Sequence, residues 1–277
     1  MIKYKFLIFC LLIIPIILII LKHNYNFDVF ISKNTCNYLC QNDKYNRVKE
    51  KGFFSDKIKI KKYLSENFPH INYAKMLYQT DDAKSLKNIS LPQDFVLKNS
   101  SGSRMFQVIT DGKYNIDDLI QKSLYFLSIN YGNNSYRKIP FLNLKEPQYD
   151  YNQKKILIEE YIPNTEEFRL IMVKGEILFY EWLGNGKNHR LDKNWKNIEV
   201  YPEDKYIKNK KIDKPKYLDE IDNFCFDFYQ QNKFDYMRID FLINEKDFYF
   251  GEVTFTPDNC RRPTLSSFNK KFEYLFA

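Results

Sequence analysis

The sequence lacks a block of basic residues, although its 43 lysines and arginines exceed its 35 aspartates and glutamates and give a formal net charge of +8. Lysines alternate with acids along most of the chain. Nucleic-acid-binding proteins usually gather basic residues into a patch or stripe, so we predict that this chain binds no nucleic acid. Internal repeats and low-complexity linkers are also lacking. With 44% hydrophobic and 28% charged residues, the 277-residue chain has the composition of a folded globular protein.

Cysteine is scarce, and the spacings of the cysteines match no zinc pattern. The five cysteines are Cys10, Cys36, Cys40, Cys225 and Cys260. Their number is odd, and their spacings as a set match no zinc pattern. Cys36 and Cys40 could face each other on one side of a helix. We expect free thiols, as in a protein of a reducing compartment.

One long apolar run stands near the N-terminus. Residues 6–21 are apolar throughout, with Pro15 inside the run and lysines on both sides. A removed signal peptide would be marked by a cleavage pattern of small residues after the run, and no such pattern follows. We therefore predict a membrane anchor in residues 1–25 that contacts the membrane through residues 6–21. The alternative is a helix buried in the protein core.

The rest of the chain shows both helical and strand periodicity, which predicts an α+β fold with antiparallel hairpins. Residues 26–90 are expected to be mixed helical and irregular, with one helix over 56–68. Further helices are expected over 117–130 and 218–231. Strands are expected over 95–98, 105–110, 156–158, 168–173, 176–182, 236–243 and 248–255. Residues 131–153 and 184–213 are expected to be loops.

The strongest chemical signal lies in the last two expected strands. Arg238 and Asp240 are two residues apart and project from the same face, and Glu252 follows on the next strand. If the two strands form a hairpin, Asp240 and Glu252 lie side by side. Two adjacent carboxylates favour a hard cation such as Mg²⁺, and the arginine could then bind a phosphate oxygen. The alternative is a solvated face with an Arg–Asp pair.

Two weaker signals precede it. Lys98 ends a strand and is followed by a serine- and glycine-containing loop, which could bind phosphate groups through backbone N–H groups. A strand that ends in acidic residues could hydrogen-bond an adenine, and an acid shortly after it could hold ribose hydroxyls. The residues concerned are Ser101, Gly102 and Ser103 in the loop, Glu159, Glu160, Tyr161 and Ile162 at the strand end, and Glu166 and Glu167 after it.

In this order, the three segments resemble the ATP-grasp superfamily. The segments around Leu91 to Lys98 and Phe250 to Pro257 are similar to the TupA-like ATP-grasp family, the amidoligases of polysaccharide biosynthesis. The resemblance covers about residues 70–265. It implies an ATP-grasp fold, in which two α+β lobes with antiparallel sheets grip ATP. The first lobe would span residues 91–165 and the second residues 166–277.

The resemblance also implies roles for these residues. The protein would be an ATP- and Mg²⁺-dependent carboxylate–amine ligase that acts through an acylphosphate in cell-surface polysaccharide biosynthesis. Its substrates would be ATP together with a carboxylate and an amine that are both sugar- or polysaccharide-linked. The implied catalytic residues are Lys98, Arg169 and Arg238; the nucleotide ligands are Lys98, Ser101, Gly102, Ser103, Glu159, Glu160, Tyr161, Ile162, Glu166 and Glu167; and the metal ligands are Asp240, Glu252 and Thr254.

Some positions depart from the usual ATP-grasp pattern. Thr254 stands where many of these enzymes have asparagine, and Pro257 is followed by Asp258 rather than glycine. Arg261 and Arg262 come next and are candidates for binding an anionic sugar or an amino-acid carboxylate. Arg169 could bind phosphate or an acidic substrate, or could instead pair with Glu166 or Glu167.

Two other functions are compatible with parts of the sequence. A glycosyltransferase-like enzyme of capsule assembly would need a sugar-nucleotide site, and the Asp-x-Asp motif is absent. A non-catalytic, membrane-anchored binding protein on the same fold would not need the retained charged residues. An ATP-dependent enzyme needs access to ATP, so we expect the catalytic domain on the cytoplasmic side of the membrane.

Overall fold

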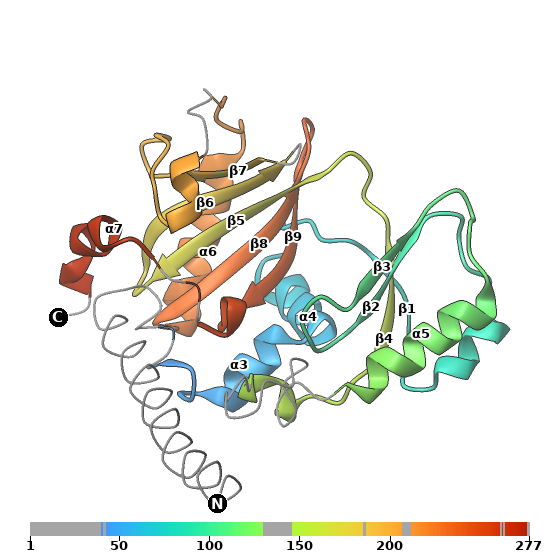
Figure 1. Ribbon diagram of the computed structural model, residues 1–277. Helices are drawn as coiled ribbons and strands as arrows, with labels where there is room; N and C mark the ends of the chain where they lie inside the picture. Colours follow the sequence, from blue (N-terminus) through green and yellow to red (C-terminus); the bar gives the residue numbers. More distant parts are fainter. Residues whose placement is uncertain are drawn as a thin grey trace, which may run out of the picture.

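The computed structural model of the protein describes residues 40, 43–129, 146–184, 187–206, 212–260, 262 and 264–275. Within these ranges, two antiparallel sheets and the helices packed on them form an α+β fold, as the sequence predicts (Figure 1). The expected membrane anchor, residues 6–21, lies outside the described residues. In the part of the chain that is described, no helix is long and apolar enough to cross a membrane.

The first sheet has four strands in the order β1-β4-β2-β3. Their bounds are β1 (Met76–Thr80), β4 (Ile156–Glu160), β2 (Phe95–Asn99) and β3 (Phe106–Ile109). Helix α5 (Ile116–Ser128) and the short helix η2 (Ala83–Asn88) cover one face and bury Leu97 and Ile158. Alternation along β2 therefore turns Val96 and Lys98 to the opposite face, which borders the cleft described below.

The second sheet has five strands in the order β7-β6-β5-β8-β9. Their bounds are β7 (Lys187–Leu191), β6 (Glu176–Gly184), β5 (Glu166–Val173), β8 (Tyr236–Ile243) and β9 (Phe248–Thr254). Helix α6 (Leu218–Asn232) is amphipathic, and its Phe224 packs with Ile239 and Phe241 of β8 in one core. Arg238 and Asp240, which alternate with these residues in β8, face away from α6 and toward the cleft.

Helices α3 (Val48–Ser55) and α4 (Lys57–Asn67) link the two sheets. Asp56 caps α4, because its carboxylate accepts hydrogen bonds from the backbone N–H groups of Ile58 and Lys59. Ile60 and Leu64 of α4 enter the core of the second sheet. The backbone N–H of Lys57 donates to the carbonyl of Ser100, beyond the end of β2, at 2.8 Å. Helix α4 is thus fixed between the two sheets (Figure 1).

Short helices complete the described fold. They are η3 (Pro147–Tyr151), η4 (Pro202–Tyr206), η5 (Pro257–Cys260), α7 (Ser266–Lys271) and η6 (Glu273–Leu275). Phe268 of α7 packs edge-on against Phe179 of β6, with 5.4 Å between the ring centroids. Helix α7 therefore covers one end of the sheet face that α6 leaves open, and the rest of this face borders the cleft (Figure 1).

Two strands were not expected from the sequence. Strand β7 lies within residues 184–213, which were expected to be irregular. Its inward position is occupied by Arg190, which is buried because it pairs with Glu181, so the strand lacks apolar alternation. Strand β1 lies in the region expected to be helical or irregular. It is an edge strand with mostly exposed side chains, and its apolar residues, Met76 to Tyr78, are consecutive and do not alternate with polar ones.

The expectation of free thiols is wrong for two cysteines. Cys40 and Cys260 form a disulfide bond, with 5.5 Å between their Cα atoms. Cys225 is a free cysteine, buried in α6. Sequence spacing gave no indication of the bond, because its partners are 220 residues apart and only the packed fold brings them together.

Candidate active site

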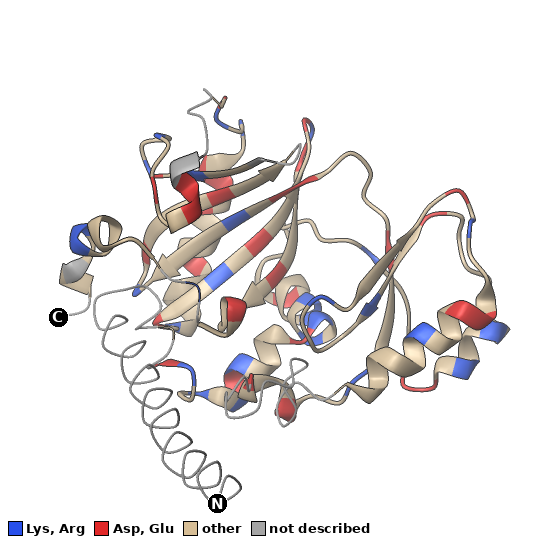
Figure 2. Cartoon of the chain, in the orientation of Figure 1, with Lys and Arg blue, Asp and Glu red and all other residues tan. Residues whose placement is uncertain are grey.

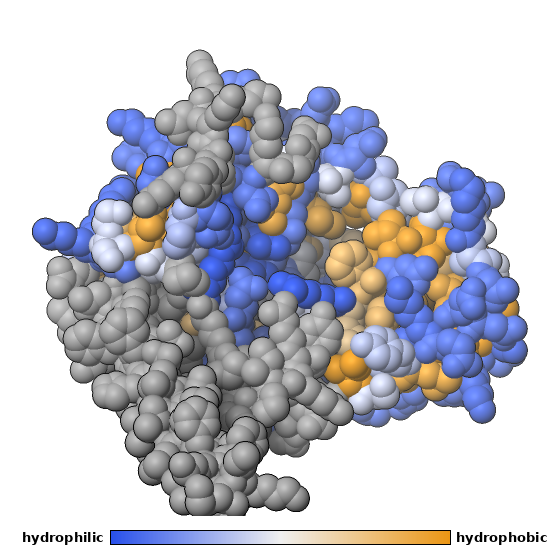
Figure 3. All heavy atoms as spheres, in the orientation of Figure 1, coloured by the Kyte–Doolittle hydropathy of each residue, from blue (hydrophilic) through white to orange (hydrophobic). Residues whose placement is uncertain are grey.

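A cleft of about 800 Å³ lies between the two sheets. Figure 3 shows the hollow, with hydrophilic residues on the side of the second sheet and apolar residues on the side of the first. In Figure 2, basic and acidic residues lie next to one another on β5 and β8, in the middle of the second sheet. A concave site with an apolar wall and convergent charged groups is typical of a ligand-binding site.

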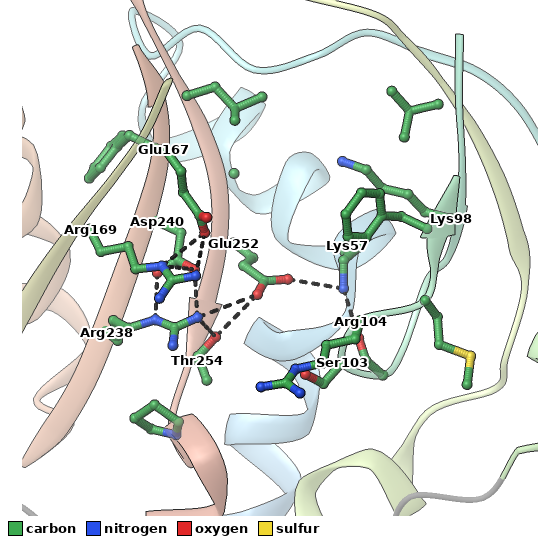
Figure 4. Close-up of a pocket in the computed structure, with 18 of the residues that line it drawn as sticks. Lys57, Lys98, Ser103, Arg104, Glu167, Arg169, Arg238, Asp240, Glu252 and Thr254 are labelled. Carbon is green, nitrogen blue, oxygen red and sulfur yellow. Dashed lines mark hydrogen bonds and ion pairs between the residues drawn. The ribbon is translucent and has the colours of Figure 1, made fainter. Parts of the chain in front are cut away.

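The charged wall is built on the hairpin of β8 and β9. Asp240 lies directly opposite Glu252, and Arg238 lies opposite Thr254. Arg238 donates hydrogen bonds to both carboxylate oxygens of Asp240, from Nε at 2.7 Å and from Nη2 at 2.6 Å (Figure 4). Its Nη2 is also 3.8 Å from Oε1 of Glu252. The hairpin register that the sequence predicts thus places the two carboxylates beside each other.

The two carboxylates have opposite pKa shifts. Burial raises the pKa of Asp240 to about 6, because Arg238 offsets only part of the desolvation and Glu252 adds negative charge. Burial would also raise the pKa of Glu252, but Lys57 and Arg238 outweigh it and lower this pKa to about 2. A buried carboxylate with a second carboxylate beside it is a place where a cation would be favourable.

The donor set fits Mg²⁺ only if a ligand contributes. Carboxylate oxygens of Asp240 and Glu252 and the Thr254 hydroxyl are hard oxygen donors, which Mg²⁺ prefers. Among the described residues, no group of three or more His, Cys, Asp or Glu side chains gathers to hold a metal ion. Mg²⁺ binds proteins through one or two carboxylates together with phosphate oxygens, and this pair has that composition.

Lys57 is a cleft residue that the sequence reasoning missed. Its Nζ lies 3.1 Å from Oε2 of Glu252 and 3.1 Å from the carbonyl oxygen of Gly102 (Figure 4). Lys57 and Lys61 are one turn apart on α4, and this i, i+4 spacing was the available signal. What the spacing could not show is that the helix lies between the two sheets.

On the first sheet, Lys98 enters the cleft and pairs with Glu159, with Nζ 2.6 Å from Oε2. Glu159 is buried and also pairs with Lys61. Burial would raise its pKa, but Lys98 and Lys61 together lower it, so the carboxylate is ionised. The side chain of Glu159 therefore holds two lysines and does not line the cleft, whereas its neighbours Glu160, Tyr161 and Ile162 do.

Only part of the loop after β2 lines the cleft. Gly102 and Ser103 line the cleft, as does Arg104. Ser101 is buried instead, and its hydroxyl accepts a hydrogen bond from Nδ2 of Asn152 at 3.2 Å. Gly102 has φ = 140°, a conformation that residues with a Cβ rarely adopt.

The two acids after the strand end point to opposite sides of the sheet. Glu167 lines the cleft and pairs with Arg169, with Oε1 2.8 Å from both Nε and Nη2. Glu166 lies outside the cleft and accepts a hydrogen bond from Nε1 of Trp182 at 2.5 Å. Arg169 lines the cleft, and its Nε is 3.7 Å from Oδ2 of Asp240. Arg169 therefore pairs with Glu167, which is one of its two expected roles, and its side chain still has access to the cleft.

The apolar wall was also not anticipated. It comes from the first sheet and the segments beside it, and includes Ala74, Val96, Met105, Phe106 and Val108. Phe106 and Val108 are exposed, although both are large and apolar. Together with Ile162 they form a surface suited to the flat face of an aromatic base.

The cleft ends at the loop after β9. Asp258, Asn259 and Arg262 line this end, with Glu146 from the segment before η3. Arg261, the other candidate for an acidic substrate, lies outside the described residues.

A family model gives an independent finding. The model described as TupA-like ATP-grasp matches residues 37–276, almost the whole chain. No curated protein matches the chain.

Solved structures of ligases are similar to the chain at low identity. D-Alanine–D-alanine ligase from Helicobacter pylori is 16% identical, with a TM-score of 0.46, over 81% of this chain and 58% of that one. The Bacillus anthracis enzyme complexed with ATP is 18% identical, with a TM-score of 0.41, over 73% and 55%. L-Amino acid ligase from Bacillus licheniformis is 12% identical, with a TM-score of 0.46, over 72% and 42%. The chain thus spans less than three fifths of the length of each.

Proposed function

The chain belongs to the TupA-like ATP-grasp family, and from this premise we propose that it is an ATP- and Mg²⁺-dependent ligase that joins a carboxylate to an amine. One observation carries the proposal. Asp240 and Glu252 are paired on one wall of a cleft to which Lys57 and Lys98 also contribute. Phosphoryl transfer depends mainly on positioning and on neutralising charge at the transferred group, and this cleft offers both signs of charge.

The cleft residues have separate roles in the proposed reaction. Asp240, Glu252 and Thr254 would hold Mg²⁺, which neutralises phosphate oxygens when bound. Lys57, Lys98 and Arg238 place positive charge on the phosphates. The adenine lies against the apolar wall, with its edge at the backbone of residues 160–162, and Glu167 holds the ribose.

The reaction has two steps. A carboxylate oxygen of the substrate attacks the γ-phosphorus of ATP, and ADP leaves with the electron pair of the broken P–O bond. The amine nitrogen then attacks the carbonyl carbon of the acylphosphate, phosphate leaves, and the nitrogen loses a proton. The cleft residues named above orient the reactants and exclude water from the acylphosphate.

We also propose that the acceptor belongs to a cell-surface polysaccharide or its precursor. The family and the apolar run of residues 6–21 support this, because membrane attachment suits a lipid-linked sugar substrate. We expect the catalytic domain on the cytoplasmic side of the membrane, where it would have access to ATP. Labelling of the full chain in intact and opened cells with a reagent that cannot cross membranes would test this orientation.

Nucleotide binding is the first test. The full chain in detergent is melted with and without Mg·AMP-PNP, beside the double variant Asp240→Asn/Glu252→Gln and the control Glu66→Gln on the exposed side of α4. We expect a magnesium-dependent rise in Tm for the wild type and the control, and its loss in the double variant. No rise in the folded wild type would contradict the proposal. ATP binding without ADP formation in the presence of candidate substrates would favour a non-catalytic binding protein.

A further inference from the structure

Three arginines share one buried carboxylate at the edge of the cleft. Glu181 of β6 has a side chain that is 2% exposed, and its Oε1 lies 2.9 Å from Nε of Arg190 and 3.4 Å from Nη1 of Arg262. Its Oε2 lies 3.3 Å from Nη1 of Arg169. Burial would raise the pKa of Glu181, but Arg190 and Arg169 lower it, so the group stays anionic. Positive charge at this buried point therefore exceeds negative charge.

Two of the three guanidinium groups, those of Arg169 and Arg262, line the cleft. Each carboxylate oxygen of Glu181 binds one of these two guanidinium groups, so Glu181 fixes the distance between them. Arg262 also stacks on the ring of Tyr201, with 3.5 Å between Cζ and the ring centroid. The orientation of its planar group is thus fixed before any ligand arrives, which lowers the entropy lost on binding.

Arg169 also lies 3.7 Å from the buried Asp240, but the remaining acidic partners of Arg169 and Arg262 are exposed to solvent. Arg262 pairs at 2.6 Å with Glu203, whose side chain is 56% exposed, and Arg169 pairs at 2.8 Å with Glu167, whose side chain is 38% exposed. Exposed ion pairs contribute little stability. A substrate anion could replace such a partner at little cost, whereas the buried bonds to Glu181 would remain.

The loop before Arg262 has a strained backbone. Asp258, Asn259 and Cys260 have φ of 48°, 57° and 60°, a left-handed conformation that is unfavourable for residues with a Cβ. The Cys40–Cys260 disulfide and a 2.5 Å hydrogen bond from Nζ of Lys44 to Oδ1 of Asn259 hold the loop in place. Backbone strain of this kind concentrates at active sites and ligand clamps.

We propose that Arg169 and Arg262 form a clamp for a carboxylate of the second substrate, one that is bound and not activated. The inference rests on the proposed ligase function. Lys57, Lys98 and Arg238 bind the phosphates, so Arg169 and Arg262 are available for the second substrate. Planar guanidinium groups bind carboxylates through paired, charge-assisted hydrogen bonds. The carboxylate could belong to an amino acid or to a uronic acid.

The test uses the full chain in detergent, saturated with Mg·AMP-PNP and also without it. L-Glutamate and D-glucuronate are the carboxylate probes, and L-alaninamide and D-glucose are the neutral ones. We expect one carboxylate probe to raise the Tm of the wild type, and its apparent affinity to fall about tenfold or more in Arg262→Gln, the change expected when a charged hydrogen bond is lost. Arg262→Lys should be intermediate, because it keeps the charge and loses the planar fork.

Lys62→Gln is the control that removes one positive charge elsewhere, since Lys62 on α4 has a side chain that is 79% exposed and lies outside the cleft. It should keep the affinity of the wild type for the probe. Stabilisation by glutamate alone assigns an amino-acid substrate, and stabilisation by glucuronate alone assigns a uronic acid. The clamp is refuted if neither probe binds, if the neutral probes bind equally well, or if Arg262→Gln binds as the wild type does. Failure of Mg·AMP-PNP to bind the wild type would instead refute the ligase function, and the arm without nucleotide still reports on the clamp.

Discussion

Nζ of Lys57 lies 3.1 Å from Oε2 of Glu252, so a lysine at the start of α4 pairs with a proposed metal ligand on β9. The same Nζ donates a 3.1 Å hydrogen bond to the carbonyl oxygen of Gly102 in the loop after β2. One side chain therefore joins the helix, the glycine-containing loop and the metal-binding hairpin. A phosphate group that enters beside Glu252 would meet this ammonium group.

Replacing this lysine should weaken nucleotide binding. In Lys57→Met we expect the Kd for Mg·AMP-PNP to rise about 10- to 100-fold, because hydrogen bonds to charged groups contribute about 1.5–3 kcal/mol. Isothermal titration of the full chain measures the change. Lys62→Met is the control on the same helix, since the side chain of Lys62 is 79% exposed, and it should bind as the wild type does. Equal affinities of Lys57→Met and wild type would exclude a role for Lys57 at the phosphates.

The two acids after the hinge should respond differently to substitution. Glu167→Gln should weaken ATP binding about tenfold, the effect of losing one charged hydrogen bond, and should bind ATP and 2′,3′-dideoxy-ATP equally. Glu166→Gln should retain nucleotide affinity and lose about 1 kcal/mol of stability, because a neutral acceptor weakens the hydrogen bond from Trp182 outside the cleft. Titration with both nucleotides and denaturant unfolding measure the two effects. The reverse outcome would assign the ribose to Glu166.

Glu146 should make stability depend on pH. Burial raises the pKa of its carboxyl group from 4.5 to about 7, and Glu252 and Asp258 add to the shift while Lys44 opposes it. The folded state then binds more protons than the unfolded state between these pH values, so this group lowers stability as pH rises from about 4.5 to 7. In Glu146→Gln this contribution is absent.

The Tm of Glu146→Gln relative to wild type should therefore increase across that interval and be constant above it. Thermal melts at a series of pH values measure the difference. Glu66→Gln, on the exposed side of α4, should show no such trend. A difference for Glu146→Gln that does not vary with pH would show that the carboxyl group is not perturbed.

The Cys40–Cys260 disulfide should contribute to stability. Its removal from a chain in which it closes a long loop is expected to cost about 2–5 kcal/mol of unfolding free energy. Reductant should therefore lower the Tm of the wild type and leave that of Cys40→Ser/Cys260→Ser unchanged. Mass spectrometry of unreduced proteolytic fragments should recover the peptides containing Cys40 and Cys260 as one linked species. Recovery of both as free thiols would contradict the bond.

Local patterns predicted much of the second sheet and its charged wall. The period of two in β8 and β9, with a short polar turn between them, indicated that Arg238 and Asp240 share a face and that Glu252 lies opposite. Helix α6 was predicted from its apolar spacing, and the β5–β6 hairpin from the strand patterns around Lys174 and Gly175. These features depend on residues close in sequence, and periodicity reports on them directly.

Alternation of side chains along β5 places Glu166 and Glu167 on opposite faces of the sheet. Glu166 and Glu167 were treated as equivalent candidates, but neighbouring residues in a strand face opposite sides, so only Glu167 lines the cleft. Strands β1 and β7 escaped prediction because an edge strand and a strand with a buried arginine both lack apolar alternation.

The sequence by itself thus determined the class of fold, the hairpin that pairs Asp240 with Glu252 and the order of segments that indicated the family. Only the tertiary structure decided that Lys57 reaches this hairpin, that Glu159 is committed to two lysines, and that Glu181 gathers three arginines. The physical reason is the range of the interactions. Register and periodicity arise between neighbours along the chain, whereas ion pairs between distant segments form only when the packing of the core brings those segments together.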